Sequence, residues 1–284
     1  MTELVASNDG IQLAYDVVGT GPAVILIAAA MQFRGFDPNT VEMAERLAAK
    51  GYTVLNFDRR GRGESERPFP CTLDDTIHDL RILIDLVAGE GGSAALYGSS
   101  SGGSIALAAA AAGLPVTQLI LWETPLGPDG GHDGTEFLEG LRNILRTGDG
   151  NAAVEFYMKD MPREWLDGAK SSPAWPVMVQ MAPSLEPDAE SLAWAQSAPR
   201  AELWAGVTQP TLAVVGEQTL PIMHSAADSI AESMPNARKV EMPGANHGWE
   251  PEVMATQIAD FLAESATWSA AASVNDSADA TKTD

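Results

Sequence analysis

The chain has 284 residues, enough for one sizeable α/β domain or two small ones. Its 39 acidic and 17 basic residues give a formal charge of -22, which argues against binding to nucleic acids or anionic membranes, because both need a basic face. The single cysteine, Cys71, excludes an internal disulfide framework and a cysteine-based metal cluster. The first residues lack the basic start and apolar run of a signal peptide, so we expect a cytoplasmic protein.

The first third of the chain alternates strand-like and helix-like segments. Strands are expected over residues 4–7, 11–18, 23–27 and 52–57. The first two flank Asn8-Asp9-Gly10, a favourable hairpin turn, and the third is continuously apolar, as in a strand covered on both faces. Helical spacing of apolar residues predicts helices over about 40–50 and from Thr72 or Asp74 to about 86.

The alternation continues, breaks and then returns. Strands are expected over 94–97 and 118–122, with a helix between them, and later over 211–215 and 239–242, with helices near 225–234 and 251–264. Between about 124 and 205 no strand is predicted. Repeated strand–helix units imply an α/β fold with a mostly parallel sheet and helices on both faces. We therefore expect a core formed by 1–123 and 206–264 and an inserted helical cap over 124–205. Over 265–284 we expect a frayed helix end followed by a disordered tail.

The strongest functional signal is a glycine-flanked serine. The run Gly98-Ser99-Ser100-Ser101-Gly102-Gly103 fits the G-x-S-x-G pattern with Ser100 at its centre, directly after a predicted strand and before a predicted helix. Small neighbours permit a sharp turn that exposes the central hydroxyl as a nucleophile. A flexible loop or a phosphate cradle is the alternative, but no lysine follows the glycines as a P-loop requires.

With two further motifs, the chain resembles the serine-hydrolase type of the α/β-hydrolase-fold superfamily over about residues 4–264. The motifs are Asp58-Arg59-Arg60-Gly61-Arg62-Gly63-Glu64-Ser65, after the strand before that of the nucleophile, and Gly244-Ala245-Asn246-His247, after the last strand. The resemblance implies that the first motif is a structural turn. An anion-binding role for its arginines is the less favoured interpretation.

Elimination among four histidines identifies the general base. His78 lies inside an amphipathic helix, His132 in a glycine- and aspartate-rich loop and His224 at the start of a helix. Only His247 follows a late strand, in the serine-before-histidine order that the fold uses. A serine hydroxyl needs such an imidazole to take its proton, so we expect His247 to activate Ser100.

The acid departs from the common family pattern. The family places an aspartate where this chain has Thr219, which cannot carry a charge. Glu123 ends the preceding strand, a position that resembles the acid of some haloalkane dehalogenases and zearalenone-type lactonases. We expect Glu123 to complete a triad with Ser100 and His247; Glu217 is the alternative.

The oxyanion hole is expected to combine two backbone amides. One belongs to Ser101, which follows the nucleophile. The other comes from the loop at 28–32, where counting from the strand end gives Ala30, with Met31 as the alternative. We expect Met31 and Trp122 to line the floor of the substrate pocket.

A serine nucleophile indicates acyl transfer, and the apolar cap favours a small apolar substrate. We expect a hydrolase of carboxylic esters or lactones, without metal or cofactor, that binds a small-molecule substrate. Two alternatives remain open: a cofactor-free lyase, oxygenase or acyltransferase on the same triad, or a hydrolase-like small-molecule receptor. The sequence predicts neither the substrate nor the oligomeric state.

Overall fold

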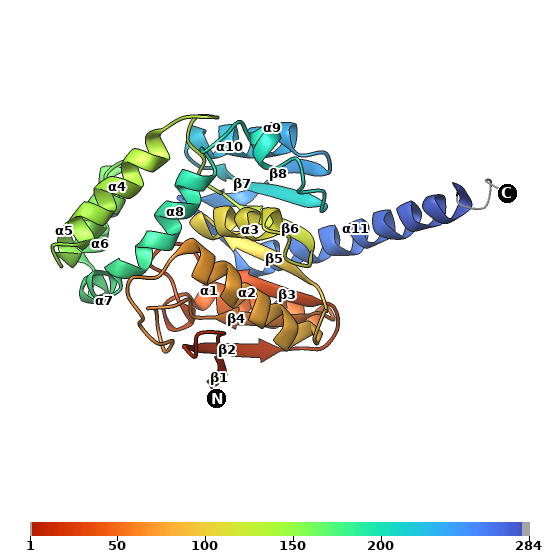
Figure 1. Ribbon diagram of the computed structural model, residues 1–284, viewed down its shortest axis with the longest axis horizontal. Coiled ribbons are helices and arrows are strands. Elements are labelled where there is room, and N and C mark those ends of the chain that lie inside the picture. Colours follow the sequence, from red (N-terminus) through yellow and green to blue (C-terminus); the bar gives the residue numbers. More distant parts are fainter. Residues whose placement is uncertain (1, 280–284) are drawn as a thin grey trace.

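The computed structural model describes the backbone of residues 2–279 and the side chains of residues 2–265. A nine-stranded sheet runs through the molecule in the order β1-β2-β4-β3-β5-β6-β7-β8-β9 (Figure 1). Its strands are β1 (Glu3–Ala6), β2 (Gln12–Val18), β3 (Ala23–Ile27), β4 (Thr53–Phe57), β5 (Ala94–Ser99), β6 (Val116–Trp122), β7 (Thr211–Gln218), β8 (Ala237–Ala245) and β9 (Gly248–Trp249). The strands from β4 to β8 pair in parallel, and β1, β2 and β9 join through antiparallel pairings. The predicted α/β class with a mostly parallel sheet is confirmed.

Helices cover both faces of this sheet, because its central strands are apolar on both sides. One face packs against α2 (Leu73–Ala88), α3 (Ser101–Ala111) and α10 (Pro221–Ser233), the other against α1 (Pro38–Ala49) and α11 (Pro251–Asp279). Successive residues of a strand enter opposite cores: Ile25 and Ile27 of β3 lie in the first, Val24 and Leu26 in the second.

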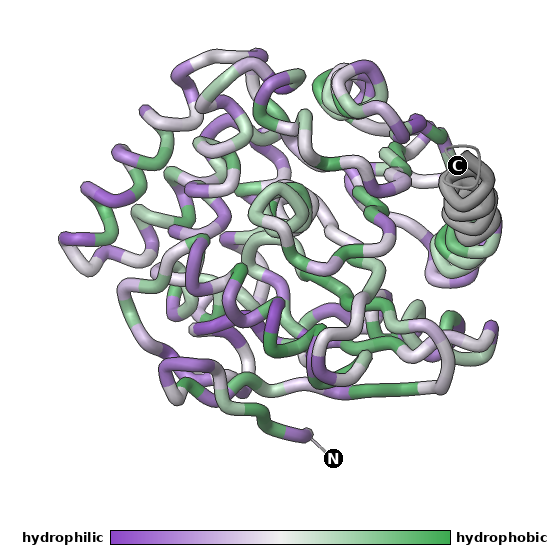
Figure 2. The backbone as a smooth tube through the Cα atoms, turned by 45° about the vertical axis from the view of Figure 1, so that its right-hand side comes forward, coloured by the Kyte–Doolittle hydropathy of each residue, from purple (hydrophilic) through white to green (hydrophobic). Residues whose placement is uncertain are grey.

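The segment between β6 and β7, which we call the cap (residues 124–205), carries helices at one side of the sheet (Figure 1). They are α4 (Asp133–Leu145), α5 (Gly150–Tyr157), α6 (Arg163–Ser171), α7 (Trp175–Gln180), the 3₁₀ helix η2 (Ala182–Leu185), α8 (Glu186–Trp194) and α9 (Arg200–Leu203). Hydrophobic and hydrophilic stretches alternate along them (Figure 2), and their apolar faces form a third core that includes Leu141, Tyr157 and Leu185.

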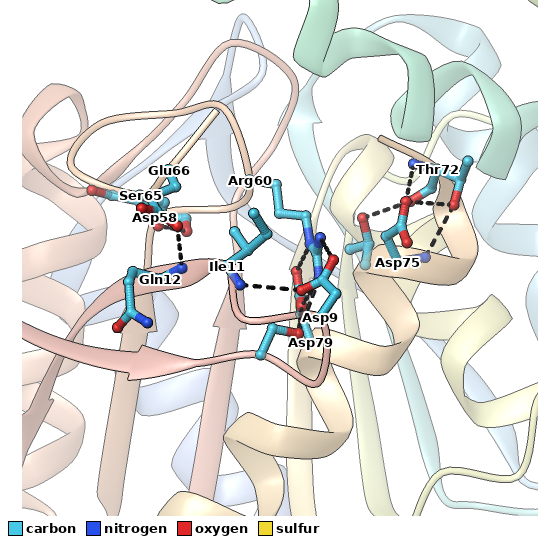
Figure 3. Close-up of polar contacts among 12 residues, drawn as sticks. Asp9, Ile11, Gln12, Asp58, Arg60, Ser65, Glu66, Thr72, Asp75 and Asp79 are labelled. Carbon is cyan, nitrogen blue, oxygen red and sulfur yellow. Dashed lines mark hydrogen bonds and ion pairs between the residues drawn. The ribbon is translucent and has the colours of Figure 1, made fainter. Parts of the chain in front are cut away.

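Local capping fixes where the core helices begin. The N-terminus of α2 carries a capping box: the Asp75 amide donates to Thr72 Oγ1 at 3.1 Å, and the Thr72 amide donates to Asp75 Oδ2 at 2.8 Å (Figure 3). Asp37 caps α1 by accepting from the Thr40 amide at 3.2 Å. A further 3₁₀ turn, η1 (Arg34–Phe36), precedes α1.

Two elements differ from the sequence prediction. The chain forms β9 directly after β8, whereas the sequence predicts a loop there. Helix α11 continues to Asp279, so the helix extends further into the tail than the frayed end that the sequence predicts after residue 264. An alanine-rich run follows residue 264, and alanine is the strongest helix former. The last predicted tail residues, 280–284, lie outside the described residues. No helix among the described residues is long and apolar enough to cross a membrane.

Candidate active site

Ser100 sits on a strained turn between β5 and α3. Its backbone has φ 54° and ψ -125°, in the left-handed range that a non-glycine residue rarely adopts. The two flanking glycines make the turn possible: a Cβ on Gly98 would lie 2.5 Å from the Gly102 carbonyl oxygen, and one on Gly102 would lie 2.4 Å from that of Ile27. The Ser100 amide also donates to the Trp122 carbonyl oxygen at 2.8 Å. The turn therefore fixes Ser100 between two neighbouring parallel strands.

His247 lies at the tip of the hairpin that joins β8 to β9. Asn246 and His247 both have positive φ, 52° and 67°, as a two-residue hairpin turn requires. The peptide oxygen of His247 accepts from Trp122 Nε1 at 3.3 Å, and the Trp165 ring of the cap stacks on the imidazole with centroids 6.1 Å apart. The core thus holds the backbone of His247, and the cap contacts its imidazole.

Glu123 supplies the carboxylate that faces this histidine. It follows β6, is buried, and brings Oε2 to 2.5 Å from His247 Nδ1. Its other oxygen accepts from the Gly216 amide at 3.0 Å. Burial by itself raises the pKa of Glu123, but hydrogen bonds from His247, Thr219 and the Gly216 amide outweigh it and hold the pKa below its ordinary value. The carboxylate is therefore ionised, and only an ionised carboxylate can stabilise an imidazolium by its charge.

The two other candidate positions for the acid have different surroundings. Thr219, at the usual acid position of the family, carries no charge itself but helps to lower the pKa of Glu123. Glu217 is exposed near the end of β7. The effect of Thr219 on Glu123 could not be predicted from the sequence, because it depends on how β6 pairs with β7.

The backbone amides predicted for the oxyanion hole differ in whether they already donate a hydrogen bond within the protein. Ser101 is the first residue of α3, where a helix leaves its amides without intrahelical acceptors. The Ala30 amide is occupied, because it donates to Ser101 Oγ at 3.1 Å. Met31, the alternative donor, has φ 58°, and its amide has no hydrogen bond to any residue within the described part of the chain.

A cavity of about 380 Å³ lies between the candidate active site and the cap. Ser100, His247 and Met31 line it from the core side. Its other walls are mostly apolar and come from the cap and from the start of α10, including Pro125, Leu126, Phe137, Tyr157, Met161, Trp165, Leu220, Ile222 and Met223. His78, His132 and His224 do not line it.

Trp122 was predicted to line the pocket floor, and this is wrong. Its side chain is fully buried in the core on the α1 and α11 face of the sheet, with Ile120 of the same strand. Leu121 points to the opposite face. Because side chains alternate along a strand, a residue adjacent to Glu123 in sequence need not face the same space.

The arginines of the 58–65 turn are buried and paired with acids of this chain. Arg60 binds Asp79 through Nε and Nη2, at 2.6 and 2.7 Å, and also contacts Asp9 (Figure 3). Arg59 and Arg62 both bind Asp188 of α8. These pairings support the structural interpretation of the turn over an anion site. Among the described residues, no group of three or more His, Cys, Asp or Glu side chains could hold a metal ion.

Comparison with known proteins identifies the family of this fold. Residues 26–261 match the model of the alpha/beta hydrolase family. An alpha/beta hydrolase from Sphaerobacter thermophilus is 30% identical, with a TM-score of 0.76, covering 92% of this chain and 100% of its own. The fold also matches a thermophilic esterase from Thermogutta terrifontis (24% identity, TM-score 0.66, covering 93% of this chain and 97% of that one) and an enol-lactonase from Burkholderia xenovorans (21%, 0.61, covering 92% and 100%). The chain belongs to the alpha/beta hydrolase family.

Proposed function

We propose that this protein hydrolyses small, mostly apolar carboxylic esters or lactones through an acyl-enzyme on Ser100. The observation that carries the proposal is the contact between His247 Nδ1 and the buried, ionised Glu123, beside a cavity that Ser100 and His247 both line. With Nδ1 engaged by the carboxylate, Nε2 is the nitrogen left to receive a proton.

The reaction follows from these positions. Ser100 Oγ attacks the carbonyl carbon while its proton passes to His247 Nε2, and Glu123 stabilises the imidazolium. The negative oxygen of the tetrahedral intermediate accepts from the free amides of Ser101 and Met31. Collapse breaks the acyl–oxygen bond, and the alcohol leaves with the proton from Nε2. Water then attacks the acyl group on Ser100 by the same proton route and releases the acid.

A panel of p-nitrophenyl esters of graded acyl length and of simple lactones tests the proposal. We expect turnover that is highest for short to medium apolar acyl groups, because the cavity of about 380 Å³ has mostly apolar walls. His247→Ala should lower kcat by about 10⁴ or more, whereas His78→Ala, an exposed histidine outside the cavity, should not. Absence of turnover together with tight binding of such compounds would contradict the proposal and favour a receptor. Product esters formed in the presence of an added alcohol would instead indicate an acyltransferase.

A further inference from the structure

A buried cluster of charged and polar side chains lies next to the candidate oxyanion hole. It consists of Arg59 and Arg62 from the turn after β4, Ser101 from the start of α3 and Asp188 from α8 of the cap; we call it the Asp188 cluster. All four side chains are buried, with exposed fractions of 3% or less. Ions removed from water need close partners, so the charges in this cluster must be satisfied within it.

The hydrogen bonds of Asp188 satisfy its carboxylate. Oδ1 accepts from Arg59 Nη2 at 2.5 Å and from Ser101 Oγ at 2.6 Å, and Oδ2 accepts from Arg62 Nη2 at 2.5 Å. Burial raises the pKa of Asp188, but Arg59, Arg62 and these hydrogen bonds outweigh it and lower the pKa below its ordinary value.

The cluster carries a positive charge in excess. Burial and the neighbouring Arg59 lower the pKa of Arg62 to about 10, so its guanidinium remains protonated at neutral pH. Arg59 and Arg62 together therefore face one aspartate, Asp188. A positive charge of this kind favours negative charge that develops nearby.

The same cluster holds the backbone of the loop at 28–32, which we call the oxyanion loop. Arg62 Nη1 donates to the carbonyl oxygens of Ala29 at 2.6 Å and Gln32 at 3.3 Å. Ser101 Oγ accepts from the Ala30 amide at 3.1 Å. These contacts hold the Ala29–Ala30 and Gln32–Phe33 peptide groups. Met31 lies between them in a left-handed backbone conformation, and its own amide has no hydrogen bond within the described part of the chain.

We propose that Asp188 is a positioning residue of the cap that orients the oxyanion loop through Ser101, Arg59 and Arg62. The inference rests on the proposed function, because it concerns the stabilisation of the tetrahedral intermediate. It assigns to the cap a second role besides enclosing the substrate: the packing of α8 against the core sets the direction of a catalytic amide. A donor moved away from a developing oxyanion costs catalysis without weakening ground-state binding.

Ser101→Ala tests this with little change in volume. It removes the hydroxyl that joins Asp188 to the Ala30 amide but keeps the backbone amide of residue 101. Ser104→Ala is the matched control, because Ser104 is equally buried on the same helix and its hydroxyl has no hydrogen-bond partner among the described residues.

We expect Ser101→Ala to lower kcat by about 10- to 100-fold with KM nearly unchanged, since misplacing one donor costs up to about 10². The inhibition constant of a trifluoromethyl ketone, which forms a tetrahedral oxyanion on Ser100, should rise by the same factor, and that of the product acid should not. Hydrogen exchange of the oxyanion loop should accelerate in Ser101→Ala and not in Ser104→Ala.

Asp188→Asn should show the same split between kcat and KM together with a lower melting temperature, because it leaves two buried guanidinium groups without a carboxylate partner among the described residues. An active wild type in which Ser101→Ala and Ser104→Ala behave alike, in kcat and in ketone inhibition, would overturn this inference alone. A wild type that neither hydrolyses esters nor binds the ketone would instead overturn the proposed function.

Discussion

At the scale of single residues, the acid of the proposed triad is the feature in which this chain departs from the pattern it otherwise resembles. Glu123 has φ 39° and extends from the end of β6 to His247. The Gly216 amide of β7 donates to it, and Thr219 helps to lower its pKa. The residue at the usual acid position of the family thus favours the ionised form of Glu123.

Exchange of this carboxylate gives the first prediction. Glu123→Gln should lower kcat by at least about 10², because a neutral amide cannot stabilise the imidazolium that forms during attack. Glu217→Gln is the matched control, since the exposed Glu217 side chain has no hydrogen bond or ion pair with His247 in the described structure and the variant should retain activity. Steady-state kinetics of the two variants on the same ester test this prediction. If Glu217→Gln lost activity and Glu123→Gln retained it, Glu217 would be the acid partner of His247 instead.

The lowered pKa of Glu123 gives a second prediction, in stability. Because the carboxyl is easier to ionise in the folded protein than in the unfolded chain, it contributes stability above its ordinary pKa of about 4.5. That contribution should disappear as the pH falls through the lower, folded-state pKa. In urea titrations, the difference in free energy of unfolding between wild type and Glu123→Gln should shrink as the pH falls below about 4.5. A difference that grows towards acid pH would contradict the pKa direction.

The sequence identifies these residues unevenly. Ser100, His247 and Glu123 could be predicted because chain order and position at strand ends bring them to one edge of a parallel sheet. Trp122 was misplaced because the alternation along β6 turns it away from Glu123. The state of the Ala30 amide could not be predicted, since it depends on a hydroxyl that Asp188, 87 residues further along the chain, holds in place.

At the scale of elements, the turn from β5 to α3 places a tight steric constraint on the sequence. Gly102→Ala would place a Cβ 2.4 Å from the Ile27 carbonyl oxygen and 2.9 Å from that of Ala28, and these are backbone atoms at the end of β3. We expect a loss of about 1–3 kcal/mol in the free energy of unfolding and a loss of activity.

Gly168→Ala is the control for this variant. Gly168 lies exposed inside α6, with no atom near the added Cβ, so the alanine should stabilise the protein by about 0.5–1 kcal/mol. Urea unfolding measures both variants. If Gly102→Ala were as stable and as active as wild type, the predicted steric clash at this turn would be contradicted.

Most elements followed from local signals, and those that did not depend on distant contacts. The capping box of α2 and the continuous apolar run of β3 predict those elements from a few residues. β9 has only two residues, Gly248 and Trp249, too few for a period-two pattern, and forms because β8 supplies its partner. Ser101 in α3 gives no sequence sign that it binds Asp188 of the cap.

At the scale of the whole molecule, charge gives a further prediction about substrates. The protein has a formal charge of -22, and the only acidic or basic side chains that line the cavity within the described structure, apart from His247, are Asp133 and Asp160. Lys159 lies 3.2 Å from Asp160 and partly offsets it, whereas Asp133 has no ion pair among the described residues. Among the described residues, no lysine or arginine therefore lines the cavity to receive a carboxylate from a substrate.

We expect a p-nitrophenyl hemiester of a dicarboxylic acid to have a kcat/KM about tenfold or more below that of a neutral ester of equal length, an effect of about 1–2 kcal/mol of Coulomb repulsion. Added salt should narrow the gap, and Asp133→Asn should raise activity on the hemiester alone. A hemiester hydrolysed faster than its neutral counterpart would contradict this electrostatic argument.

The central claim is that Ser100 forms a covalent intermediate activated by His247 and Glu123. Peptide mass spectrometry after reaction with a fluorophosphonate tests it most directly, because the reagent marks the activated hydroxyl itself. We predict one adduct, on Ser100, absent in Ser100→Ala and formed far more slowly in His247→Ala. An adduct on Ser99 or Ser101, or labelling that persists in Ser100→Ala, would contradict the assignment of the nucleophile.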